Sequence, residues 1–142
     1  MATTAQYTAQ PIIEGFSVAS TDTSRSAPST TTTLAAGPTT TAAAGVGKRI
    51  LRVTVNEVNA IGAGAANVLR FWVASTSSGT KYLLAEKVIT AVTSTSTAAG
   101  FRIEVPELVG LVLPGHATTP ATIFASSHLA ATYHIVIESG LL

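Results

Sequence analysis

KRILRVTVNEV, residues 48–58, alternates apolar and polar side chains along its length. Leu51, Val53 and Val55 fall on one side of an extended chain, and the polar residues between them fall on the other. A period of two is typical of a β-strand that has one face on a core and one face toward solvent. The stretch therefore predicts a strand of an antiparallel sheet.

Similar strand-like patterns of apolar and polar residues continue through most of the chain. Further strands are expected at 11–20, 67–75, 81–90, 101–105, 108–113, 121–127 and 132–139. Glycine, serine and proline clusters between them, such as Pro114-Gly115, are turn signals, and no segment has a convincing helical pattern. About eight regularly spaced strands predict an all-β, antiparallel, jelly roll-like sandwich, with the order of the strands left open.

The adjacent aromatic residues Phe71 and Trp72 are expected to point to opposite faces of their strand. One of them anchors the core. The other is either an exposed aromatic, as in a sugar-binding platform or an interface, or is buried between the sheet and a loop. Trp72, Tyr82 and Tyr133 are the aromatic residues considered for such a platform.

Residues 1–47 have a different composition. The stretch SAPSTTTTLAAGPTTTAAAGVGKR, residues 26–49, consists almost wholly of small and polar residues and reads as a flexible linker. The alternative is an extended arm that lies across a neighbouring subunit. We therefore divide the chain into an arm, 1–47, that contacts partner subunits, and a β-sandwich domain, 48–142. Deleting residues 1–40 is then expected to leave the sandwich folded but to weaken attachment or self-assembly.

Three residues are predicted to bind partners, namely Tyr7 and Leu34 of the arm and Trp72 of the sandwich. Composition also favours association. Only 11% of the 142 residues are charged, against about 25% in ordinary soluble domains. A net charge of +1 gives little repulsion between copies and argues against binding to nucleic acid or an anionic membrane.

The mean hydropathy of +0.44 is high. Even so, the two long stretches without charged residues, 26–47 and 108–137, are broken by proline and glycine, so neither is expected to span a membrane. A soluble protein this apolar is expected to bury surface against partners.

Signals for chemistry are sparse. IGAGAAN, residues 61–67, matches the start of a dinucleotide fingerprint, but a strand is expected after it where the fingerprint needs a helix. A zinc site built from His116, His128 and His134 is conceivable, although loop and surface roles are favoured. The absence of cysteine excludes thiolate sites, and the scattered carboxylates suggest no acid–base pair. We expect no enzyme activity, no cofactor and no metal.

The basic cluster Lys48, Arg49 and Arg52 is divided between two strand faces. Salt bridges to neighbouring glutamates are therefore favoured over a phosphate site.

From RILRVTVNEV onward the chain resembles small structural proteins from the virion gene blocks of tailed bacteriophages. The resemblance runs through VLRFWVAS, KYLLAEKVITAVTSTSTAAGFRIEV and LVLPGHATTPATIFASSHLAATYHIVIESG. It covers roughly residues 48–140, without a catalytic signature, and no binding residue is carried over from it.

The resemblance implies a β-sandwich virion component such as a head-decoration, or cement, protein. We expect a non-enzymatic protein on the capsid surface of the virion, assembled in the bacterial cytoplasm. Its expected partners are the major capsid protein and copies of itself, with a trimer favoured. Alternatives are a tail, collar or fibre-base component, or a carbohydrate-binding or adhesin module.

Overall fold

The computed structural model describes residues 10–39, 47–59, 66–90 and 99–142. Within these ranges the chain forms nine β-strands and one short 3₁₀ helix. The elements are β1 (Gln10–Val18), β2 (Thr32–Ala36), β3 (Gly47–Asn59), β4 (Asn67–Ala74), β5 (Tyr82–Ile89), β6 (Arg102–Glu104), η2 (Pro106–Leu108), β7 (Val112–Pro114), β8 (Thr122–Ser127) and β9 (Thr132–Leu141). The predicted all-β fold is confirmed.

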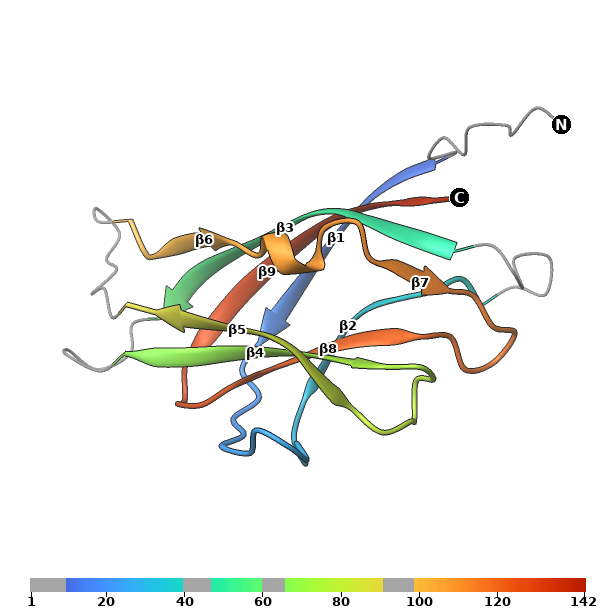
Figure 1. Cartoon of the computed structure of the whole chain (residues 1–142). Helices are drawn as coiled ribbons and strands as arrows, with labels where there is room; N and C mark the ends of the chain where they lie inside the picture. Colours follow the sequence, from blue (N-terminus) through green and yellow to red (C-terminus); the bar gives the residue numbers. More distant parts are fainter. Residues whose placement is uncertain (1–9, 40–46, 60–65, 91–98) are drawn as a thin grey trace, which may run out of the picture.

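The strands form two sheets that face each other (Figure 1). Sheet A has the order β1-β9-β3-β6, and β7 pairs with β3 farther along the same edge. Sheet B has the order β2-β8-β4-β5. Every pairing between these strands is antiparallel.

The pairings are nested. The first strand pairs with the last, β2 with β8, β3 with β6 and β7, and β4 with β5. Folding one long hairpin over on itself produces this order, which is the connectivity of a jelly roll. The predicted jelly roll-like sandwich is therefore present, with the strand between β5 and β8 broken into two short pieces.

The core lies between the sheets and follows the predicted alternation with one exception. Val53 and Val55 are buried as expected, but Leu51 is 42% exposed. The pairing of β3 with β9 slips between Ile50 and Arg52, so Ile50 takes the inward position in place of Leu51. A β-bulge inserts one residue and so changes which side chains face inward beyond it.

The expected strand at 108–113 is shorter in the structure. Pro106 has no N–H to donate to a ladder, and η2 begins there. Gly110 then has a φ of +86°, a conformation that favours glycine, before β7 resumes the pairing with β3. Among the described residues, no helix has the length and apolar character needed to cross a membrane.

The division at residue 47 is wrong for residues 10–36. β1 pairs with β9 along its whole length, and β2 pairs with β8, so both strands belong to the sandwich of their own chain. Val18, Leu34 and Ala35 are part of the hydrophobic core. A chain that lacks residues 1–40 would lose a strand from each sheet, so we no longer expect it to fold. Residues 1–9 and 40–46 lie outside the described residues.

Candidate functional site

Residues 19–31, here called the strap, connect β1 to β2 and lie on the side of sheet B that faces away from sheet A (Figure 1). The strap begins beside β8, where Asp22 N–H donates to the carbonyl oxygen of Ser127 and Ser127 N–H donates to that of Ser20. Residues 26–31, the first part of the segment that reads as a linker, thus belong to a strap that is held by the protein's own sheet.

The carboxylate of Asp22 organises the strap. It accepts hydrogen bonds from the backbone N–H groups of Ser24, Ser29 and Thr30 at 2.8, 2.6 and 2.8 Å, and from the Ser29 hydroxyl at 3.1 Å. Asp22 is only 7% exposed. The N–H of Thr30 above all, followed by those of Ser24 and Ser29, lowers the pKa of Asp22 against the opposing effect of burial.

A three-residue ion network ties the strap to sheet B. Glu86 of β5 accepts from Arg70 Nε of β4 at 2.8 Å and from Arg25 Nη2 of the strap at 2.8 Å. Arg70 also donates to the carbonyl oxygen of Asp22 at 3.2 Å. The hydrogen bond from Arg25, followed by that from Arg70, lowers the pKa of Glu86.

Trp72 lies on the outer face of sheet B, the face on which the strap also lies. It is opposite Phe124 in the β4–β8 pairing, so both side chains are on the outer face of sheet B, yet Trp72 is 0% exposed and Phe124 5%. Trp72 Nε1 donates to Ser126 Oγ at 3.0 Å, and the two aromatic residues form a small second core with Ala74. Of the two fates expected for this tryptophan, burial is the one observed.

The three residues predicted to bind partners are not brought together at the surface. Trp72 is 0% exposed in the small cluster with Ala74 and Phe124, and Leu34 is 4% exposed in the main core. Neither side chain presents a surface to a partner in this structure, because both are packed within the chain's own sandwich. Tyr7 lies outside the described residues.

Tyr82 is the exposed aromatic residue of the candidate platform. Its side chain is 64% exposed, whereas Tyr133 is buried. Tyr133 packs in the core, where its hydroxyl accepts from Asn67 Nδ2 at 2.7 Å and burial raises its pKa. Of the three aromatics considered for a sugar platform, only Tyr82 is accessible.

An apolar cavity of about 340 Å³, here called the Tyr82 pocket, opens beside this residue. It lies where the edge strands β5 and β7 of the two sheets separate. Farther along, η2 closes the same side of the sandwich through an ion pair between Lys87 and Glu107. The lining residues are Val73, Ala74, Ser75, Tyr82, Leu111, Val112, Leu113, Pro114 and Ala121.

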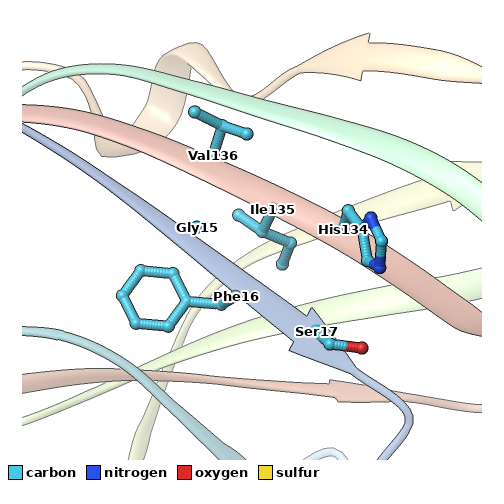
Figure 2. A pocket seen from close by; sticks show the side chains of 6 residues that line it. All are labelled: Gly15, Phe16, Ser17, His134, Ile135 and Val136. Atoms are coloured by element: carbon cyan, nitrogen blue, oxygen red, sulfur yellow. The ribbon is translucent and has the colours of Figure 1, made fainter.

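A second depression, of about 320 Å³, lies on sheet A between β1 and β9 (Figure 2). Gly15 lies opposite Val136, and Ser17 lies opposite His134. Figure 2 shows Phe16 directed away from Val136, toward the other sheet. A Cβ built on Gly15 would meet nothing within 4 Å, so the missing side chain leaves the surface hollow. Sequence reasoning missed this feature, although a glycine inside a strand can signal such a close approach.

Five of the seven carboxylates are engaged in structural contacts. Besides Asp22 and Glu86, Glu14 pairs with Lys48 at 3.1 Å, Glu104 with Arg52 at 2.7 Å, and Glu107 with Lys87. The predicted pairing of the basic cluster with glutamates is confirmed for Lys48 and Arg52.

The three histidines are at separate places. In a turn, the ring Nδ1 of His116 accepts from the backbone N–H groups of Thr118 and Thr119. The backbone N–H of His128 donates to the Val68 carbonyl oxygen. His134 is exposed on sheet A. The described ranges contain no group of three or more His, Cys, Asp or Glu residues that could hold a metal ion. Most of the glycine-rich stretch 61–67 lies outside the described residues, and the strand β4 follows it.

No protein-family model, no curated protein and no solved structure matches this chain.

Proposed function

We propose that this chain is a non-enzymatic structural subunit of a tailed-bacteriophage virion, a decoration protein that binds the capsid surface and stabilises the head shell. Its partners would be the major capsid protein and further copies of the chain, with a trimer as the favoured oligomer. The resemblance of residues 48–140 to such virion components motivates the proposal.

The observation that carries the proposal is the number of large apolar side chains on a surface with few charges. The exposed ones are Ile13, Leu51, Val58, Tyr82, Leu83, Val88, Val109 and Val112. Two of them, Tyr82 and Val112, border the Tyr82 pocket and so belong to one continuous apolar surface. Continuous apolar surface marks interaction sites, and many weak contacts repeated over a shell reach high avidity without strong individual affinity. A small, weakly charged sandwich is suited to that mode of binding.

The distribution of carboxylates also supports a structural role. Glu14, Glu86, Glu104 and Glu107 are each held by a lysine or arginine, and Asp22 is enclosed by backbone N–H groups. Carboxylates so engaged brace the fold. General acid–base catalysis instead requires a proton-transferring group directed at a substrate.

Quantitative mass spectrometry of purified particles of the phage that encodes the chain tests the proposal. A decoration protein is expected in a fixed, high ratio to the major capsid protein. A low copy number typical of a ring would instead indicate the tail or collar alternative. Absence of the chain from particles would overturn the virion assignment altogether.

Binding to shells assembled without the chain tests which surface makes the contact. We expect Tyr82→Ser to weaken binding because Tyr82 borders the apolar pocket. Val88→Ser is the matched control, because Val88 is 63% exposed on the same strand but does not line the pocket. Equal binding of both variants and the unaltered protein would remove the Tyr82 pocket from the proposed capsid contact.

The carbohydrate-binding alternative rests on the same exposed ring. An accessible tyrosine beside a cavity of about 340 Å³ could stack on a sugar. A glycan array decides between the two functions. Glycan binding that is lost in Tyr82→Ala and kept in Val88→Ala would favour the lectin-like function over the capsid proposal.

A further inference from the structure

β1 is an open edge of sheet A. Within the described part of the chain it pairs only with β9, so its second edge has no hydrogen-bonded strand beside it. The strand is nine residues long and pairs in continuous register from Gln10 to Val18. Long, regular edges can accept another strand, and proteins that must stay monomeric usually protect them.

The outer face of β1 carries little protection of this kind. Pro11, Ile13, Gly15 and Ser17 point away from sheet B and are exposed, and none of them is charged. The one charged residue of the strand, Glu14, faces inward and pairs with Lys48. Pro11 stands at the start of the strand, where it can block only the first position.

The same face carries a projection and a matching hollow two residues apart. Ile13 is 74% exposed, the highest value among the exposed large apolar residues. The depression over Gly15 is bordered by Ser17, His134 and Val136 (Figure 2). An antiparallel pairing of two β1 strands centred on Glu14 would place Ile13 of each copy opposite Gly15 of the other.

We propose that β1 is a self-pairing edge, through which a second copy of this chain docks antiparallel so that each Ile13 side chain enters the other copy's Gly15 depression. The contact is two-fold symmetric, because the same projection and hollow serve on both sides. It joins two copies of sheet A into one continuous sheet.

The occupant is a second copy because the surface complements itself. An unrelated strand could use the free backbone groups, but it would have no reason to match an isoleucine and a hollow at this spacing. The net charge of +1 adds little repulsion. The pairing does not depend on the virion assignment, and it would not by itself build a trimer.

The contact is expected to be weak in solution. One strand edge buries less surface than the roughly 1,200 Å² of a standard interface, so the dissociation constant should lie at about the micromolar level or above. Sedimentation velocity over a range reaching about 500 µM therefore suits the measurement.

Two variants act from opposite sides of the contact. Ile13→Lys places a charge on the edge, and Gly15→Val fills the hollow. Gly15 has no positive φ and no neighbour within 4 Å of an added Cβ, so the monomer should tolerate valine. Val88→Lys, at another exposed edge position, is the control. We expect concentration-dependent dimers for the unaltered protein and Val88→Lys, and monomers for Ile13→Lys and Gly15→Val.

Cysteine trapping reads the register directly, because the chain has no cysteine of its own. In the proposed pairing Pro11 lies opposite Ser17 of the other copy. A mixture of Pro11→Cys and Ser17→Cys proteins should form disulfide-linked dimers under mild oxidation, and each protein alone should form few. A monomeric unaltered protein throughout the concentration range, or dimers unaffected by both Ile13→Lys and Gly15→Val, would overturn the proposal.

Discussion

Replacing Asp22 with alanine is expected to detach the strap from sheet B. The substitution removes the acceptor shared by three backbone N–H groups and one hydroxyl. Arg70 would still donate to the main-chain oxygen of residue 22. However, the carboxylate that holds the N–H groups of residues 24, 29 and 30 around this position would be gone. The strap should then open while the two sheets remain paired.

The size of the effect follows from these contacts. A hydrogen bond to a charged group contributes about 1.5–3 kcal/mol, but an open strap lets water satisfy the released N–H groups. We therefore expect a loss of about 2–4 kcal/mol in the free energy of unfolding, rather than the sum over all the bonds. For a domain of this length that corresponds to a fall in melting temperature of about 10 °C.

Trp72 provides the assay because it is the single tryptophan of the chain and lies buried on the outer face of sheet B, where the strap also lies. In Asp22→Ala its emission should shift to longer wavelength, and acrylamide should quench it more strongly, while far-ultraviolet circular dichroism still reports β-sheet. Asp22→Asn keeps one acceptor oxygen, so its emission wavelength and its acrylamide quenching should lie between those of the unaltered protein and those of Asp22→Ala.

Glu104→Gln is the control, because it removes an exposed partner of Arg52 far from the strap and should leave both the melting temperature and Trp72 unchanged. If Asp22→Ala melts within about 2 °C of the unaltered protein and Trp72 is still shielded from acrylamide, the Asp22 carboxylate does not hold the strap on sheet B.

Acid should open the strap as well. The pKa values of Asp22 and Glu86 are lowered from ordinary values of 3.8 and 4.5, so the stability they contribute is present at neutral pH and is lost as the pH falls through their folded values, below about pH 4. Trp72 quenching that stays constant through the acid range until the sheets themselves unfold would contradict this. Leu34→Ala should cost about 2–4 kcal/mol in urea unfolding, because Leu34 is a core residue, whereas Val88→Ala should change little. Deleting residues 1–36 should abolish the cooperative thermal transition seen by circular dichroism, and a cooperatively folding truncated chain would show that β1 and β2 are dispensable.

The positions of most strands could be predicted because the signal for a strand is local. Residues 48–58 and 132–139 alternate with a period of two, and the structure has β3 and β9 there with the expected residues inward except Leu51. The bulge at Leu51 was not predictable, since it depends on how β3 registers against β9, whose paired residues Glu138 and Ser139 lie nearly ninety positions later in the chain. The candidate site was harder to predict from the sequence than the strands were. Tyr82 could be named from its residue type, but its exposure and its pocket depend on where β5 and β7 separate.

The sequence by itself determined an all-β sandwich and its apolar, weakly charged character, because both follow from composition and short-range periodicity. Only the tertiary structure decided the role of residues 10–36. A strand was expected at 11–20, but its pairing with β9 was not, and the threonine, serine and alanine of residues 19–36 are equally compatible with a free linker and with a strand. What holds them are partners remote in sequence, such as β8 for β2, and Arg70 and Glu86 for the strap. A segment without a strong preference of its own takes the conformation in which its backbone groups and its few charges find such partners.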